Sequence, residues 1–172
     1  MFIMIDVEAD GPIPGEYSMI AFAAVVCRDS SVRFRANLRP VTEKYMEDAL
    51  RVANFTREET LGFDNPENVM KSFRDWLSEC NPKRERLFFI SDNNGFDWQF
   101  MNYYFWRYLD ANPFGHSSFN LGSFYKGLIK DAFQNFKHLR ETPHSHDPLD
   151  DALGNVEALK KIIQEFEVKI RL

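Results

Sequence analysis

The N-terminus constrains the fold most, because it joins a buried-type strand to two closely spaced acids. Residues 2–5 are the apolar run Phe-Ile-Met-Ile, and Asp6 and Glu8 follow with one residue between them. A short apolar run is typical of a strand that is covered on both faces of a sheet. Side chains two positions apart point to the same face of a strand, so the two carboxylates converge. The alternative is a strand that ends in an ordinary polar turn at residues 9–11.

Two carboxylates on one face of a strand predict a cation site. They repel each other and raise each other's pKa unless a cation lies between them. Magnesium and manganese prefer oxygen ligands of this kind. The rest of the chain must then supply further ligands.

Length and composition favour one domain that spans residues 1–172. Hydrophobic residues make up 44% of the chain and Phe occurs 17 times, which is enough for a sizeable core. The net charge of −5 argues against a broad surface that coats nucleic acid, although a local basic track remains possible. The longest apolar run, residues 19–27, is too short to cross a bilayer. Cys27 and Cys80 lack metal-ligand spacing. We therefore expect a cytoplasmic protein with no membrane partner.

The order of patterns along the chain predicts an α/β fold. Apolar or alternating runs at residues 2–5, 17–26 and 32–38 predict three strands of an antiparallel meander. Further strands are expected at residues 87–90 and 114–120, with short helical pieces within residues 42–60. Longer helices are expected from Asn65-Pro66 and over residues 96–109, 121–136 and 148–166. Such a chain forms a mixed sheet with helices on its faces.

A third acid, Asp97, lies just after the strand expected at residues 87–90, at the start of the helix expected over residues 96–109. If that strand runs parallel beside the first, its end lies next to Asp6 and Glu8, where ligand sites of α/β sheets gather. The alternative is that Asp97 only stabilises the N-terminus of the following helix.

The last group of acids surrounds the start of the final helix. Asp147 is expected to be its N-cap, Pro148 its first residue and Asp150 a capping-box partner. Asp151 has no such structural role, but periodicity alone does not decide whether Asp150 or Asp151 enters a site.

Histidines precede the same helix. His146 lies in the loop directly before it, where the side chain can reach a water molecule. A zinc site built from His138, His144 and His146 is the alternative, although no nearby Cys completes a usual ligand set.

Taken together, these motifs resemble those of the DEDDh family of 3′–5′ exonucleases. The motifs are Asp6-x-Glu8, Asn94-Gly95-x-Asp97 and His146-x4-Asp151-Ala152. Within the family, the chain is most similar to small bacterial exoribonucleases of the oligoribonuclease, RNase T and RNase AS kind. The resemblance implies a ribonuclease H-like fold with sheet order 3-2-1-4-5, and it implies that Asp151 is the last ligand.

The resemblance also implies a mechanism with two divalent cations, Mg²⁺ or Mn²⁺. Asp6, Glu8 and Asp151 would hold one ion, and Asp6 with Asp97 the second. Such a pair stabilises the attacking and leaving oxygens of an in-line displacement. His146 would act as general base, since neutral imidazole accepts a proton near neutral pH. The products would be nucleoside 5′-monophosphates.

The expected substrate is a single strand, with RNA favoured over DNA by the resemblance. The backbone around Ala9 and Asp10 would meet the terminal 3′-hydroxyl, and Phe96 and Trp98 are candidates to stack on the last bases. A homodimer is also expected from the family. The alternatives are a proofreading DNA exonuclease that acts with a polymerase, and an inactive nuclease-like module that binds nucleic acid.

Overall fold

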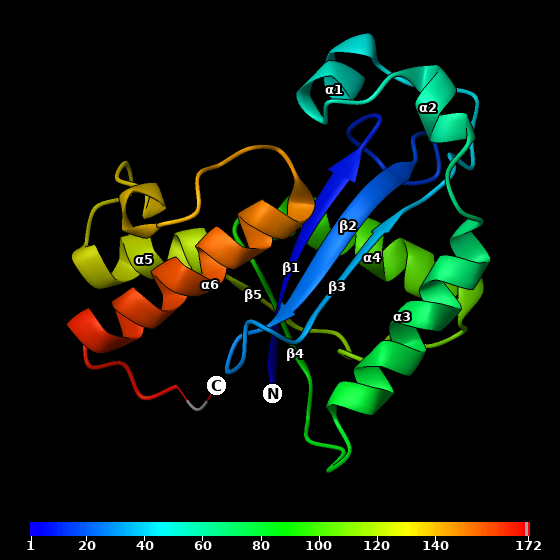
Figure 1. Ribbon diagram of the computed structural model, residues 1–172. Helices are drawn as coiled ribbons and strands as arrows, with labels where there is room; N and C mark the ends of the chain where they lie inside the picture. Colours follow the sequence, from blue (N-terminus) through cyan, green and yellow to red (C-terminus); the bar gives the residue numbers. More distant parts are fainter. Residues whose placement is uncertain (171) are drawn as a thin grey trace.

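The protein is built on one five-stranded sheet. The computed structural model describes residues 1–170 and residue 172. The strand order is β3-β2-β1-β4-β5 (Figure 1). The strands are β1 Phe2–Ala9, β2 Met19–Val26, β3 Arg33–Asn37, β4 Phe88–Ser91 and β5 Ser118–Asn120. The first three pair antiparallel, whereas β4 runs parallel to both β1 and β5. The predicted fold class and strand order are therefore confirmed.

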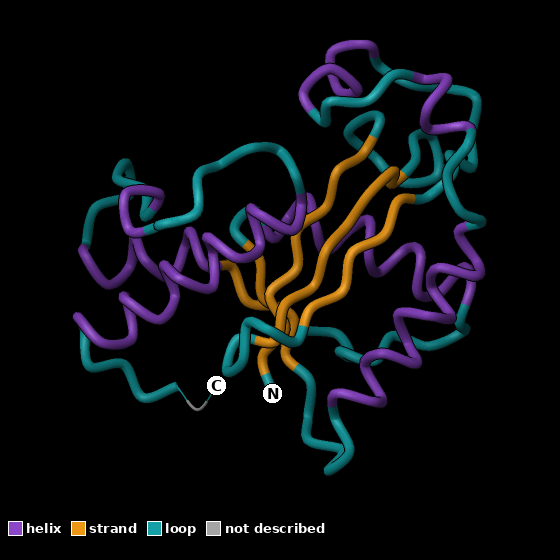
Figure 2. Tube along the Cα trace, in the orientation of Figure 1, coloured by secondary structure: helices purple, strands orange, loops and turns teal. Residues whose placement is uncertain are grey.

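Helices cover both faces of this sheet (Figures 1 and 2). In chain order they are α1 Glu47–Val52, α2 Arg57–Leu61, α3 Pro66–Cys80, α4 Asn94–Tyr108, α5 Leu121–Ile129 and α6 Pro148–Glu165, with a 3₁₀ turn at Lys137–Leu139. Helices α3 and α4 lie on one face, and α5 and α6 on the other. Among the described residues, no helix combines the length and the apolar character that a membrane span requires.

The alternation of side chains along β1 divides the core into two layers. Ile3, Ile5 and Val7 pack with the α3 and α4 side chains, whereas Met4 packs with those of α6. Because side chains of a strand alternate, Asp6 and Glu8 continue the row of Met4 and face α6. The strand pattern therefore decides which helix can meet the two acids.

The segment after α5 differs from the prediction. A helix was expected over residues 121–136, but α5 ends at Ile129 and Lys130 adopts a left-handed conformation with φ of 58°. Beyond it, Asp131 accepts a hydrogen bond from the Phe133 N–H at 2.9 Å, and Asn135 accepts one from the Lys137 N–H at 3.0 Å. Such local bonds compete with the helical ladder and end it early. Strand β5 is likewise shorter than the expected residues 114–120.

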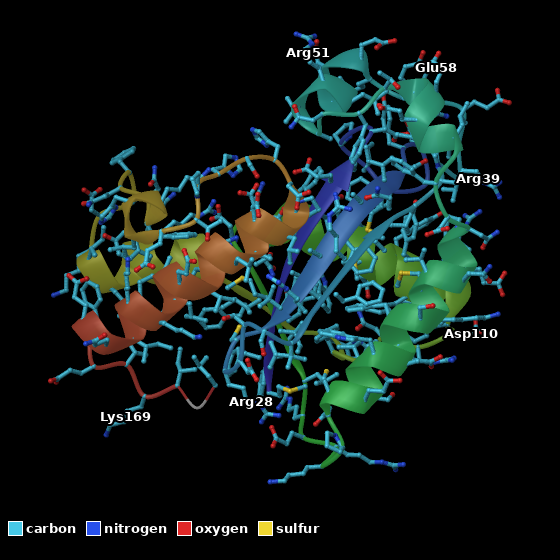
Figure 3. All side chains as sticks on the ribbon, viewed as in Figure 1. Arg28, Arg39, Arg51, Glu58, Asp110 and Lys169 are labelled. Atoms are coloured by element: carbon cyan, nitrogen blue, oxygen red, sulfur yellow. The ribbon has the colours of Figure 1, made fainter. Side chains whose placement is uncertain are left out.

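Charged side chains lie mainly at the periphery of the molecule (Figure 3). Arg51 and Glu58, on the short helices above the carboxyl end of β1, point outward. On β3, the guanidinium of Arg35 pairs with the carboxylate of Asp147 at 2.8 Å. This arrangement leaves the carboxyl end of β1 as the place where acids gather inside the fold.

Candidate active site

Asp6 and Glu8 meet the α6 helix at the carboxyl end of β1. The carboxylate oxygens of Asp6, Glu8 and Asp151 lie within 4.8 Å of one another, so one ion could contact all three. Asp6 and Glu8 are half-buried, and the side chain of Asp151 is 2% exposed. The sheet and the helix thus bring together acids that are more than 140 residues apart.

The capping of α6 places Asp151 at this cluster. Asp147 accepts a hydrogen bond from the Leu149 N–H at 2.9 Å, and Pro148 is the first helical residue, as expected. The expected capping box does not form: Asp150 accepts instead from the Ser145 hydroxyl at 3.0 Å. Asp150 therefore points to the preceding loop, and Asp151 is the acid that the helix presents to β1.

Asp97 joins the cluster from α4. Its Oδ1 accepts a hydrogen bond at 3.1 Å from the N–H of Val7, the residue between Asp6 and Glu8. Asp97 is 4% exposed. The N-cap residue of α4 is Asn93, four residues earlier. Asp97 thus lies against strand β1 rather than serving as the cap of its own helix.

The electrostatics of the cluster are unfavourable without a cation. Burial raises the pKa of Asp6 well above its usual range, and the carboxylates of Asp97, Glu8 and Asp151 raise it further. Burial together with Asp151 and Asp97 raises the pKa of Glu8 to about 8. Burial also raises the pKa of Asp97. The raised pKa values of Asp6, Glu8 and Asp97 fit a site for a hard divalent cation, which would stabilise their charged forms.

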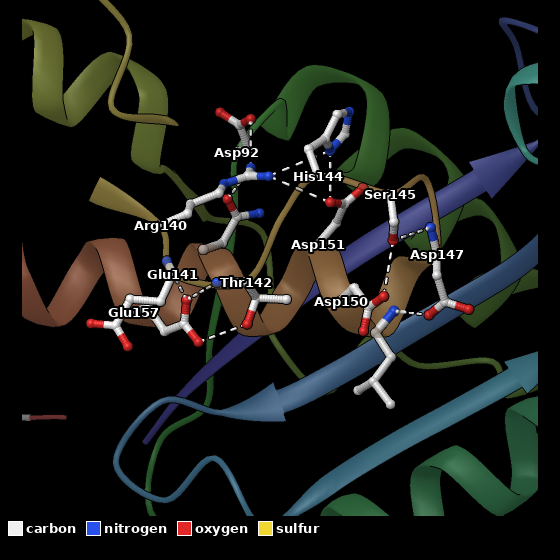
Figure 4. Close-up of polar contacts among 12 residues, drawn as sticks. Asp92, Arg140, Glu141, Thr142, His144, Ser145, Asp147, Asp150, Asp151 and Glu157 are labelled. Carbon is white, nitrogen blue, oxygen red and sulfur yellow. Dashed lines mark hydrogen bonds and ion pairs between the residues drawn. The ribbon is translucent and has the colours of Figure 1, made fainter. Parts of the chain in front are cut away.

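A buried arginine that the sequence analysis did not identify borders the cluster (Figure 4). The Arg140 side chain is 5% exposed, and its guanidinium lies 3.4 Å from both Asp151 and Asp92 and also contacts Asn155. Its charge lowers the pKa of Asp6, opposing the larger effects that raise it. Asn155 lies one helical turn after Asp151, so both side chains are on the side of α6 that meets Arg140.

Glutamate 157 fixes the loop that carries this arginine. Glu157 accepts hydrogen bonds at 2.8 Å from the N–H groups of Glu141 and Thr142 and from the Thr142 hydroxyl (Figure 4). At Gly154, an added Cβ would lie 2.9 Å from the Thr142 carbonyl and 3.0 Å from the Arg140 side chain. The loop can therefore approach α6 closely only where that helix has a glycine.

Two histidines lie beside Asp151. The rings of His144 and His146 are 4.2 Å apart, and a nitrogen of each lies within 4.8 Å of an Asp151 oxygen. His144 Nδ1 contacts Asp151 Oδ1 directly at 2.6 Å (Figure 4). His146 has a left-handed backbone with φ of 59°. His138 packs edge-on against Tyr125 and is not in this group, so the zinc set that includes it is not assembled.

The predicted substrate contacts have different placements. Ala9 ends β1, where a register shift separates it from Glu8. Phe96 and Trp98 are half-buried and pack against the core rings of Phe100 and Phe89, each at 5.1 Å.

Asp10 is bonded within the fold, and the contact of the backbone around Ala9 and Asp10 with the 3′-hydroxyl stays a prediction. Its carboxylate pairs with Arg57 at 3.0 Å and accepts from the Ser18 N–H, and its backbone N–H and carbonyl bond to Ser18 and Met46. Because these groups already have partners and Asp10 is fully buried, the structure gives it a structural role in the loop.

Known proteins resemble this chain in sequence and in fold. No family model matches the sequence. The chain is 33% identical over 178 residues to the 3′-5′ DNA exonuclease Cap18 of Escherichia coli, and the alignment covers 98% of this chain and 95% of that protein.

Solved structures share the fold at low sequence identity. The nuclease domain of 3′hExo, a DEDDh family member bound to rAMP, aligns with a TM-score of 0.75 at 17% identity, over 99% of this chain and 96% of that one. Cell-death related nuclease 4 aligns with a TM-score of 0.78 at 17% identity, over 95% of this chain and 64% of that one. With the sequence relative and the acid cluster, these findings show that the chain belongs to the DEDDh family of 3′–5′ exonucleases.

Proposed function

We propose that this protein is a metal-dependent exonuclease that removes nucleotides from the 3′ end of single-stranded DNA. The observation that carries the proposal is the cluster of Asp6, Glu8 and Asp151, whose oxygens lie within 4.8 Å and which has no counter-charge equal to its own. Buried acids that repel one another are costly to a fold, and they are retained where a cation binds.

Four acids would hold the metal. Asp6, Glu8 and Asp151 provide one set of oxygens, and Asp97, held against β1 by the Val7 N–H, extends the set toward a second ion. When bound, Mg²⁺ or Mn²⁺ supplies charge stabilisation for the attacking and leaving oxygens of phosphoryl displacement. The protein contributes the positions of these carboxylates, which the sheet and two helices fix before substrate arrives.

His146 is the proposed general base. A nitrogen of its ring lies within 4.8 Å of an Asp151 oxygen, and its imidazole would accept the proton of the attacking water at a ring nitrogen. The phosphorus–oxygen bond to the 3′ oxygen of the preceding nucleotide then breaks, which releases a nucleoside 5′-monophosphate. His144, already bonded to Asp151, would orient that carboxylate.

DNA is the favoured polymer. The relative that is 33% identical over nearly the whole chain is named a DNA exonuclease, whereas the resemblance of the motifs alone favoured RNA. This supports the DNA activity that was the alternative in the sequence analysis, without requiring a polymerase. A homodimer remains part of the proposal from the family resemblance. Sedimentation at micromolar concentration tests it, and a fully active monomer would refute it.

The polymer and the metal can be tested in one cleavage experiment. Single-stranded DNA and RNA of the same sequence, labelled at the 5′ end, are incubated with the full-length protein and Mg²⁺, with EDTA as control. We expect a ladder that shortens from the 3′ end of DNA, faster than of RNA, and no ladder with EDTA or with Asp151→Asn. Faster cleavage of RNA than of DNA would mean that RNA is the preferred substrate. Cleavage that continues in EDTA would refute the proposed metal dependence.

A further inference from the structure

A groove on the outer face of α4 has no role in the chemistry described above. Its volume is about 690 Å³. Its lining includes Pro14, Trp98, Asn102, Tyr103, Trp106 and Arg107. Trp98, Asn102 and Trp106 recur every four residues and form one stripe of the helix, while Phe100, Met101, Tyr104 and Phe105 face the core.

The groove combines an exposed aromatic ring with an unneutralised cation. Trp106 is 51% exposed, so its indole is not needed to complete the core. The Arg107 guanidinium donates to the Tyr103 hydroxyl at 2.6 Å and lies 5.7 Å from the centres of the Tyr103 and Tyr108 rings. In the part of the chain that the structure describes, no ion pair involves Arg107. Aromatic faces beside a guanidinium are the groups that bind bases and phosphates of single strands.

The groove adjoins the loop that leaves the candidate active site. Pro14 belongs to the loop that follows the acids of β1, and Gln99 of α4 donates to the Pro12 carbonyl of the same loop at 3.0 Å. Trp98 directly follows Asp97 in the chain. The helix therefore runs from the acid cluster, near its N-terminus, to Trp106 near its other end.

We propose that this groove binds the part of the single strand upstream of the 3′ end, with a base on Trp106 and a phosphate at Arg107. The proposal rests on the exonuclease function proposed above. Trp98 and Trp106 are eight positions apart, or about 12 Å along a helix. Stacked nucleotides rise about 3.4 Å each, so the groove spans about three or four nucleotides. Its place beside the loop that follows the acids, and an arginine without an ion pair among the described residues, favour a polyanion over a protein partner or a second copy of this chain.

A length series of oligonucleotides tests the groove separately from the chemistry. Cleavage of single-stranded DNA of two, four, six, eight and twelve nucleotides is measured for the full-length protein, Trp106→Ala and Arg107→Gln. We expect KM for the strands of six or more nucleotides to rise about 5- to 150-fold in Trp106→Ala, the worth of one stacked base. KM and kcat for the dinucleotide should stay within about twofold of the unchanged protein. Trp106→Tyr should restore part of the loss.

Matched controls separate the groove from general surface effects. Phe133→Ala removes an aromatic ring that is 97% exposed, and Arg74→Gln removes an exposed arginine of α3; neither lines the groove. Both should leave the length dependence unchanged. Equal losses on dinucleotide and long strands, or no loss on either, would overturn the proposal. A changed sedimentation profile with unchanged length dependence would overturn it in favour of a subunit interface.

The same variants keep the two proposals distinguishable. If the unchanged protein cleaves no strand, the exonuclease function fails, and fluorescence anisotropy with a labelled twelve-nucleotide strand in EDTA still tests the groove. There, Trp106→Ala must weaken binding at least about fivefold. Equal affinity for both proteins would refute the groove whatever the activity.

Discussion

Two aspartates four residues apart, Asp6 and Asp10, differ in the groups that neutralise them. Asp10 has an arginine of its own, since Arg57 lies 3.0 Å from its carboxylate, and the Ser18 N–H also bonds to it. Asp6 has mainly other acids around it, and no ion pair reaches it within the described chain. Burial raises the pKa of both carboxyls, but Arg57 and Ser18 oppose the shift at Asp10, whereas three carboxylates add to it at Asp6.

The comparison separates an acid that the fold neutralises from an acid that it leaves without a cation. A buried charge must be paired or it costs several kcal/mol. The fold supplies the partner of Asp10 from α2 and thereby fixes the loop after β1. It leaves the partner of Asp6 to come from solution. Two acids of the same segment thus differ in whether the fold itself neutralises them, Asp10 by Arg57 and Asp6 by no cationic partner of its own among the described residues.

The largest effect is expected for Asp6→Asn. Loss of one ligand oxygen should lower turnover at least about 10³-fold, because the metal's charge stabilisation is worth several kcal/mol. The metal-free protein should be no less stable, since the change removes a repelling charge. Single-turnover cleavage and thermal unfolding in EDTA measure the two. An active Asp6→Asn protein, or a strongly destabilised one, would contradict the assignment.

The next largest loss of turnover is expected for variants of the two histidines beside the acid cluster. His146→Ala should lower turnover by about 10²–10⁴-fold, the usual worth of a positioned base. His144→Ala is the matched control, because the two rings are only 4.2 Å apart. It should cost less than His146→Ala, with the loss appearing as a higher Mg²⁺ requirement. If the order of the two losses is reversed, the base is His144.

A smaller effect, on stability rather than on turnover, is expected when Asp10 loses its ion-pair partner. Arg57→Met leaves the buried Asp10 carboxylate without its cation, and breaking a buried pair costs about 3 kcal/mol. Activity per folded molecule should stay close to that of the unchanged protein. Urea unfolding and turnover, measured on the same preparations, check both statements. A loss of turnover without a loss of stability would return Asp10 to the active site, where the sequence analysis had placed it.

Local spacing made much of the fold and cluster predictable. The alternation along β1 places Asp6 and Glu8 on one face, and the Asp-Pro start of α6 is visible in the sequence. These features depend on neighbours within a few residues, so a pattern can record them. The choice between Asp150 and Asp151 required the family resemblance.

Long-range partners could not be predicted. Nothing in the sequence near Asp10 indicates that Arg57, 47 positions later, folds back onto it. The sequence around Arg140 is typical of an exposed loop. The burial of Arg140 among Asp92, Asp151 and Asn155 depends on the packing of α6 against the sheet. The early end of α5 was missed because short polar side chains bond locally to the backbone, and that competition overrides the apolar period.

The dependence of stability on pH sharpens the comparison further. The pKa of Glu8 is raised from 4.5 to about 8, so in this range the folded metal-free protein keeps a proton that the unfolded chain releases. The unfolded state then binds fewer protons, and stability falls as the pH rises from about 4.5 to about 8. Mg²⁺ should reverse the fall, because a bound cation favours the charged carboxylates.

Thermal unfolding at about pH 5 and pH 8 measures this linkage. The rise in Tm caused by Mg²⁺ should be larger at the higher pH, where binding displaces fewer protons. Glu8→Gln should flatten the dependence in EDTA. An equal rise at both pH values would mean that the cluster is already ionised without metal.

The smallest effect is expected for Asp150→Asn, at the residue directly before Asp151. Asp150 and Asp151 are adjacent on α6, but the Asp150 carboxylate accepts from the Ser145 hydroxyl at 3.0 Å, whereas Asp151 lies with Asp6 and Glu8 and its side chain is 2% exposed. Asp150→Asn keeps the shape and an acceptor oxygen, so the free energy of unfolding should change by no more than about 0.5 kcal/mol. Turnover and the Mg²⁺ requirement should be unchanged, whereas Asp151→Asn should abolish turnover. A higher Mg²⁺ requirement in Asp150→Asn would mean that the helix end rotates when the metal binds and brings Asp150 toward the ion.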